Sequence, residues 1–133
     1  MLSAFAGPAS AGPLTKRILV VDDEPGMLKS LAIMLRRERY HVGEALSVAD
    51  AVGQLKRETF DLVIADLMMN PLNGLDLLTL ARRYHPQCPV IIMTAYGTPE
   101  NRSEALRLGA LDFLEKPLEA TRLLPRIQQL LEG

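Results

Sequence analysis

Cysteine is nearly absent from the sequence, since Cys88 is the only one among 133 residues. A single cysteine cannot close an intramolecular disulfide, and no cluster of histidine and cysteine surrounds it to indicate a zinc site. Long apolar runs are lacking too, because none approaches the ~20 residues that a membrane-spanning helix needs. We therefore expect a cytoplasmic protein without membrane contact, with Cys88 as a buried or half-buried thiol beside a strand.

An excess of either charge is also lacking. The chain has 15 Lys and Arg against 16 Asp and Glu, and 48% of its residues are hydrophobic. This is the composition of an ordinary soluble domain without the basic excess of a nucleic-acid binder. The basic run Arg36–Arg39 is interpreted as the solvated end of a helix. We expect no direct binding of nucleic acid by this domain.

The length of the chain suits one domain with a real core. Residues 1–15 are rich in Ala, Gly, Pro and Ser, and they lack the basic start and long apolar middle of a secretory signal. We expect residues 1–15 to be a disordered leader and residues 16–133 to form the domain. No linker to a second domain is seen, so no output domain is expected in this chain.

Short apolar runs alternate with longer segments of helical period from residue 17 onward. Strands are predicted at the apolar runs 18–21, 41–45, 62–65, 89–93 and 111–115. The periodicity predicts helices from about 25, from about 48 to 57, from 75 to 84, from 99 to 108 and from 118 to 131. Ser47 with Asp50 fits a capping box, and Thr98 followed by Pro99 fits a helix start.

Strands that are apolar on both faces and alternate with amphipathic helices predict a parallel sheet covered on both sides. This is a doubly wound α/β fold. Right-handed crossovers place the carboxyl ends of all strands at one edge of the sheet, where ligands bind in such folds. Function is therefore expected at that edge.

Polar residues follow the strands at this edge. The first strand is followed by three acids, Asp22, Asp23 and Glu24. The third, fourth and fifth strands end at an acid, a hydroxyl and an ammonium group, which are Asp66, Thr94 and Lys116. Carboxylates a few ångströms apart repel, and burying part of that charge unpaired costs several kcal/mol. Lys116 offsets one charge. The remainder suits a hard divalent cation, and Mg²⁺ is favoured because it needs few protein carboxylates and keeps water in its shell.

A phosphoryl group bound beside such an ion would explain the presence of the remaining side chains. Thr94 can donate a hydrogen bond to one phosphoryl oxygen, and Lys116 can pair with another. Asp66 is then the acceptor, because a carboxylate is a competent nucleophile and forms an acyl phosphate. No general base is needed, since a carboxylate is ionised at neutral pH and the reaction is governed by positioning and charge neutralisation.

Four segments resemble, in this order, the receiver domains of two-component response regulators: VVDDE, VIADLMMNPLNG, IIMTAYG and DFLEKP. The resemblance covers nearly the whole chain from Arg17 onward, with each segment at the end of a predicted strand. It implies a flavodoxin-like fold of five parallel strands in the order 2-1-3-4-5. MTAYGTPE followed by LGALDFLEKP is most similar to receivers of the nitrogen-regulation class.

The resemblance implies a role for each acid. Asp66 is the aspartate that accepts a phosphoryl group from a sensor histidine kinase. Asp23 and Asp66 are direct magnesium ligands, Asp22 acts partly through water, and the backbone carbonyl of Met68 completes the ligand set. A receiver is a phosphoacceptor that catalyses only its own phosphorylation and dephosphorylation, so we expect no conventional enzyme.

The resemblance also implies how a signal leaves the site. Thr94 and Lys116 are the phosphate contacts, and the Lys116–Pro117 peptide bond is cis. Thr94 moves toward the phosphoryl group, and Phe113 rotates inward into the space behind it. The face formed by the fourth helix, fifth strand and fifth helix then changes, which controls an output or partner and provides a surface for a homodimer.

One position departs from the family pattern. Receivers commonly have Pro four residues after the phosphorylated aspartate, whereas here Asn70 occupies that position and Pro71 follows. We expect a different turn in this loop, while Gly74 still opens the next helix. Met68 and Tyr96 flank the site, and their bulk is expected to slow attack by water on the acyl phosphate.

Three other functions compete with this interpretation. A magnesium-dependent phosphatase with an aspartyl nucleophile usually carries a second Asp two residues later, where this chain has Met68. A flavin or nucleotide module of the same fold needs a Gly-, Ser- or Thr-rich loop after the first strand, and DDEPG would repel its phosphate. A purely structural interaction domain would have no use for Asp66 and Lys116 together.

Overall fold

Strands and helices alternate regularly in the computed structural model, which describes residues 15–132. The elements are β1 (Arg17–Val21), α1 (Pro25–Arg37), β2 (His41–Ala45), α2 (Val48–Arg57), β3 (Leu62–Asp66), α3 (Gly74–Tyr84), β4 (Val90–Thr94), α4 (Pro99–Arg107), β5 (Asp112–Glu115) and α5 (Ala120–Glu132). The leader expected over residues 1–15 lies outside the described residues except for Thr15. Among the described helices none has the length and apolarity needed to cross a bilayer.

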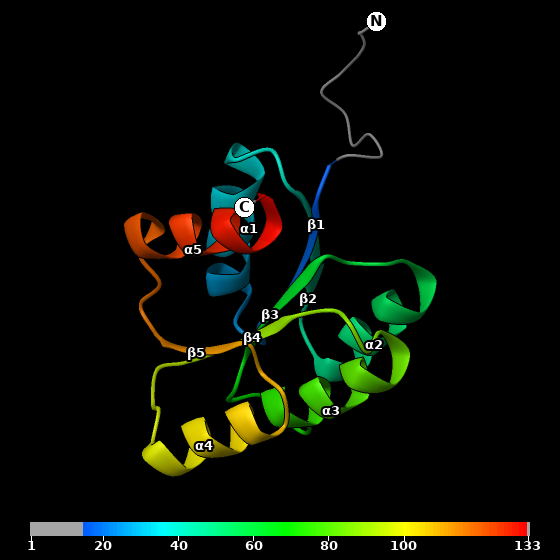
Figure 1. Ribbon diagram of the computed structural model, residues 1–133, viewed down its shortest axis with the longest axis vertical. Coiled ribbons are helices and arrows are strands. Elements are labelled where there is room, and N and C mark those ends of the chain that lie inside the picture. The colour runs from blue at the N-terminus through cyan, green and yellow to red at the C-terminus, as the bar shows by residue number, and fades with distance from the viewer. Residues whose placement is uncertain (1–14, 133) are drawn as a thin grey trace, which may run out of the picture.

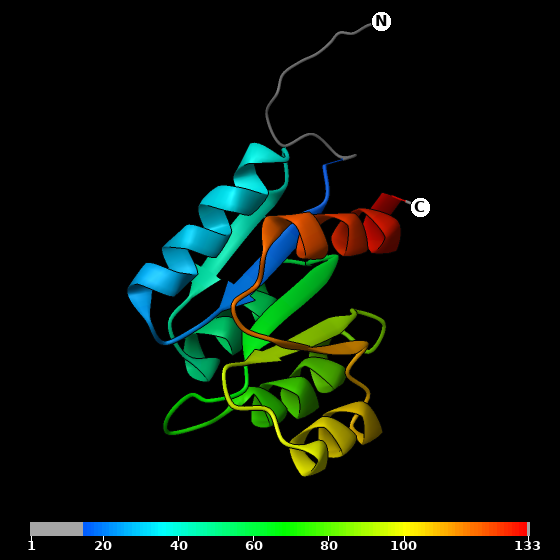
Figure 2. The same ribbon diagram turned by 90° about the vertical axis from the view of Figure 1, so that its left-hand side faces the viewer.

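The five strands form one parallel sheet in the order β2-β1-β3-β4-β5, as predicted. Helices α1 and α5 cover one face of the sheet, and α2, α3 and α4 cover the other (Figures 1 and 2). The doubly wound arrangement follows from right-handed crossovers between parallel strands. It brings the carboxyl ends of all five strands to one edge.

Burial on both faces explains why the central strands lack an alternating pattern. In β1, Ile18 and Val20 pack into the core beneath α1 and α5, whereas Leu19 and Val21 pack into the core beneath α2, α3 and α4. Every residue of β3 and β4 is buried. A continuous apolar run is the sequence pattern of such a strand.

Helix ends follow local signals, with one correction. Ser47 caps α2 by accepting the Asp50 N–H through its hydroxyl at 3.1 Å. The predicted capping box is wrong in its second half, because the Asp50 carboxylate accepts from the Gln54 amide at 3.4 Å. A complete capping box instead opens α3, where Asn73 and Asp76 bond reciprocally. This box anchors the helix that follows Asp66.

The last helix begins at Ala120, two residues later than predicted. Leu118 lies outside the helix and still packs against the core beneath α1 and α5. The apolar pattern in the sequence therefore begins before the helix itself. The N–H of Leu123 donates to the Glu119 carbonyl at 2.9 Å, which closes the first turn. Cys88 is 6% exposed just before β4, as predicted for a buried thiol beside a strand.

Candidate functional site

The acids predicted to meet at the carboxyl edge of the sheet do meet there. Carboxylate oxygens of Asp22, Asp23 and Asp66 all lie within 4.8 Å of one another. Asp22 and Asp66 are buried, at 1% and 6% exposure, whereas Asp23 is exposed. Glu24 contributes its main-chain N–H, which donates to Asp22 Oδ1 at 3.0 Å. Three of the four predicted acids therefore form one oxygen-rich cluster that is open on the Asp23 side.

Lys116 reaches into this cluster from the end of β5. Its Nζ lies 2.9 Å from Asp22 Oδ2 and 3.2 Å from Asp66 Oδ2, with only 10% of its side chain exposed. Burial acts to lower the pKa of Lys116, but the hydrogen bonds and charges of the two carboxylates outweigh it, and the pKa is raised. Lys116 is therefore firmly cationic.

Asp66 is the acid most affected by its surroundings. Burial raises its pKa, and the charge of Asp22 acts in the same direction, whereas Lys116 and the Met68 N–H oppose the shift. The Met68 N–H donates to Asp66 Oδ1 at 3.2 Å, so each carboxylate oxygen has one partner. One ammonium group faces three carboxylates, which leaves excess negative charge that an oxygen-preferring cation would neutralise.

A family model described as the response regulator receiver domain matches residues 18–128. This chain belongs to the receiver domain family. It is therefore a phosphoacceptor signalling domain of two-component regulation and not a conventional enzyme. The acidic cluster is typical of the magnesium site of a receiver.

Relatives of this receiver are larger regulators. It is 41% identical over 108 residues to the response regulator protein PilR of Pseudomonas aeruginosa, covering 81% of this chain and 24% of that protein. It is 40% identical over 115 residues to the transcriptional regulatory protein GlrR of Escherichia coli K12, covering 86% of this chain and 26% of that protein. The chain thus spans about a quarter of these relatives, which place it in the nitrogen-regulation class.

Solved receiver structures have the same fold. A CheY-like receiver domain from Methanospirillum hungatei superposes with a TM-score of 0.85 at 31% identity, covering 89% of this chain and 94% of that one. The beryllofluoride-activated NtrC4 receiver domain dimer superposes with a TM-score of 0.83 at 32% identity, covering 89% of this chain and 98% of that one. The predicted fold and family are confirmed.

The loop after Asp66 in this receiver is held close to the strand. Gly74 opens α3 as predicted, and a Cβ atom there would lie 2.5 Å from the Asp66 carbonyl oxygen. The Gly74 N–H donates to the Leu67 carbonyl at 3.0 Å. The Asn70–Pro71 bond is cis, which sequence reasoning did not predict although it marked this position as unusual. The Lys116–Pro117 bond is also cis, in agreement with the resemblance.

The two residues expected to form the receiver's switch lie against the same glycine. Thr94 is fully buried, and its Oγ1 accepts the Tyr96 N–H at 3.1 Å. Phe113 is 3% exposed. A Cβ atom on Gly97 would lie 3.0 Å from Phe113 Cε2 and 3.3 Å from Thr94 Cγ2. Sequence reasoning missed Gly97, for which a lone glycine in the loop after β4 was the only signal.

Proposed function

We propose that this chain accepts a phosphoryl group on Asp66 from the phosphohistidine of a sensor histidine kinase, in a Mg²⁺-dependent reaction, and thereby changes its α4-β5-α5 face. The observation that carries the proposal is the Asp66 carboxylate, buried within 4.8 Å of two other acids and 3.2 Å from the Lys116 ammonium group. A purely structural domain would gain nothing from that arrangement.

The donor set fits magnesium. All three clustered side chains offer carboxylate oxygen, and Lys116 offsets only part of their charge. Asp23 and Asp66 would bind the ion directly, Asp22 partly through water, and the Met68 carbonyl would complete the set. When bound, Mg²⁺ neutralises charge on the phosphoryl oxygens.

The residues of the chain carry out the transfer itself. A carboxylate oxygen of Asp66 attacks phosphorus, the bond from phosphorus to the histidine nitrogen breaks, and its electron pair stays on that nitrogen. Lys116 pairs with a phosphoryl oxygen. The Thr94 hydroxyl oxygen accepts the Tyr96 N–H, which leaves its own hydrogen to donate to a second phosphoryl oxygen.

Exposed apolar side chains around the acids favour a protein as the donor. They lie in the first turn of α1 and in the connections after β2, β3 and β4, at the edge where Asp66 is buried: Met27, Leu46, Met68, Leu72 and Tyr96. A small phosphodonor would not cover this apolar rim. A kinase surface that brings its phosphohistidine to Asp66 would bury the rim and gain hydrophobic stabilisation.

The output is proposed to leave through the α4-β5-α5 face, with Thr94 and Phe113 as the switch. The same face is proposed to pair two copies of the chain, and a dimer of the NtrC4 receiver is among its structural relatives. Since the chain spans about a quarter of its curated relatives, the output is expected to lie in other domains or partners. We propose a cytoplasmic domain that does not itself bind nucleic acid.

Incubation with acetyl phosphate tests the chemistry. One phosphoryl group, detected by intact mass, is expected with Mg²⁺, and none is expected without Mg²⁺ or in Asp66→Ala. Asp50→Ala, at an exposed position on α2, is the matched control and should react normally. A phosphoryl group that persists in Asp66→Ala would overturn the proposal.

A phosphorylated histidine kinase tests the donor. Leu46→Ser combined with Leu72→Ser should slow transfer from the kinase while leaving the reaction with acetyl phosphate unchanged, because only the protein donor contacts these rim residues. Equal rates of transfer from the kinase to the variant and the wild-type chain would contradict the assignment of the rim.

A further inference from the structure

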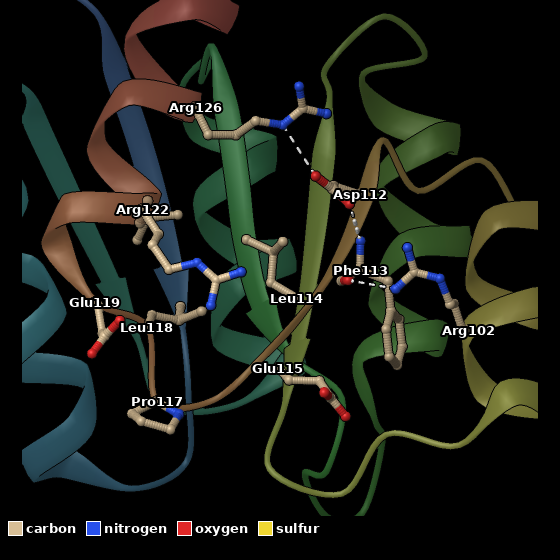
Figure 3. A pocket seen from close by; sticks show the side chains of 11 residues that line it. Arg102, Asp112, Phe113, Leu114, Glu115, Pro117, Leu118, Glu119, Arg122 and Arg126 are labelled. Carbon is tan, nitrogen blue, oxygen red and sulfur yellow. Dashed lines mark hydrogen bonds and ion pairs between the residues drawn. The ribbon is translucent and has the colours of Figure 1, made fainter.

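Phe113 lies on β5, an edge strand that pairs only with β4 in the described sheet. Its main-chain groups are satisfied by side chains. The Phe113 N–H donates to Asp112 Oδ1 at 2.8 Å, and the Phe113 carbonyl accepts from Arg102 Nη1 at 3.0 Å (Figure 3). The open edge of the sheet is therefore capped at the residue expected to act as the switch.

The same contacts connect Phe113 to two helices. Arg102 comes from α4, and Asp112 accepts from Arg126 Nε of α5 at 3.0 Å (Figure 3). A continuous chain of hydrogen bonds thus runs from α5 through Arg126, Asp112 and Phe113 to Arg102 on α4. These are the elements that form the proposed output face.

Arg102 also contacts the aromatic ring. Its guanidinium carbon lies 5.8 Å from the centroid of Phe113, within the range of a cation–π interaction. The ring is buried and lies close to Gly97, and Thr94 lies close to the same glycine. Arg102 therefore binds both the main chain and the buried ring of one residue.

The contact is accessible from solvent. Arg102, Asp112 and Arg126 line a cavity of about 380 Å³ between α4, β5 and α5 (Figure 3). Arg102 is itself exposed, whereas the ring it covers is not. Replacing this side chain therefore changes the surroundings of Phe113 without opening the core.

We propose that Arg102 is a positioning residue of this receiver, which holds the Phe113 ring inward beside Thr94 and so favours the conformation that binds a phosphoryl group at Asp66. The inference rests on the proposed function, because it assumes that Thr94 connects the two sites. Linked equilibria are reciprocal. If phosphorylation shifts the equilibrium toward the inward ring by some factor, then loss of the inward ring weakens binding of a phosphoryl group at Asp66 by the same factor.

The test uses Arg102→Met, which keeps the apolar stem and removes the guanidinium group. Beryllofluoride with Mg²⁺ serves as the phosphoryl mimic, and its affinity is expected to fall about two- to fivefold, the range of an exposed cation–π contact. Arg102→Lys retains a cation and should recover part of that loss. Arg107→Met, on the same helix and paired with Glu104, is the control and should bind normally.

Fluorine NMR reads the ring directly. 4-Fluorophenylalanine is incorporated, and the Phe113 resonance is assigned by its loss in Phe113→Leu. Arg102→Met should move the fluorine chemical shift of Phe113 toward that of a solvent-exposed ring, while the chemical shift of Phe60 stays unchanged. An unmoved Phe113 resonance, or unchanged beryllofluoride affinity, would overturn the role of Arg102. Failure of the wild-type chain to take up a phosphoryl group from acetyl phosphate would refute the proposed function instead, and the ring position would still be measured.

Discussion

Lys116 and Asp66 are 50 positions apart in the chain, yet the ammonium nitrogen of one lies 3.2 Å from a carboxylate oxygen of the other. The same nitrogen lies 2.9 Å from Asp22 Oδ2. Lys116 thus contacts two carboxylates that are also proposed to hold Mg²⁺. The lysine and the metal ion are therefore expected to compete for the buried carboxylates.

Lys116→Met tests this competition. Without Mg²⁺ the variant should lose about 3–5 kcal/mol of stability, because two buried carboxylates lose their cation. Its Mg²⁺ affinity should rise on the order of tenfold, since the competing charge is gone. Urea unfolding and Mg²⁺ titration measure both. Lys29→Met, which breaks a surface pair with Glu44, is the control, and weaker Mg²⁺ binding by Lys116→Met would contradict the idea.

Gly74→Ala should displace the strand end that carries Asp66. The added Cβ would lie 2.5 Å from the Asp66 carbonyl oxygen, so the main chain must shift, at a cost of about 1–3 kcal/mol. Gly26→Ala is the matched control, because nothing lies within 4 Å of its Cβ and it should gain up to about 1 kcal/mol. Urea unfolding compares the two. Equal stability of the two variants would show that the close approach has no consequence.

Met68→Ser combined with Tyr96→Ser should shorten the lifetime of the phosphorylated state several-fold. Both side chains flank the Asp66 site, and their apolar bulk is expected to hinder attack by water. Loss of the phosphoryl group is followed by intact mass over time. Leu111→Ser, another exposed apolar residue but placed before β5 at the opposite end of that strand, is the control. Unchanged dephosphorylation in the double variant would refute the shielding.

Cys88 should make stability depend on alkaline pH. Burial raises the pKa of its thiol from 9.0 to about 11. Between those values the unfolded chain releases a proton that the folded chain keeps, so stability falls as pH rises, by up to about 2–3 kcal/mol. Urea unfolding from about pH 8 to 11 should show a steeper fall in the wild-type chain than in Cys88→Ala. Parallel slopes would count against a buried neutral thiol.

Local patterns predicted the elements well where burial decides the composition. The apolar runs predicted β3 and β4 correctly, because both faces of these strands are covered. Thr98 and Pro99 marked the start of α4 correctly through their capping chemistry. The start of α5 was misplaced because Leu118, which lies in the connection before the helix, is half-buried against the core, and such a loop residue has the same apolar character as a helical one.

The sequence by itself determined that acids, a hydroxyl and an ammonium group meet at one edge of a parallel sheet, because strand periodicity and crossover handedness depend only on local burial and chain chirality. Tertiary structure alone decided that Lys116 contacts both Asp22 and Asp66, and that Arg102 covers the buried ring of Phe113. Such contacts join residues far apart in the chain, and they depend on the direction of each side chain after the helices have packed.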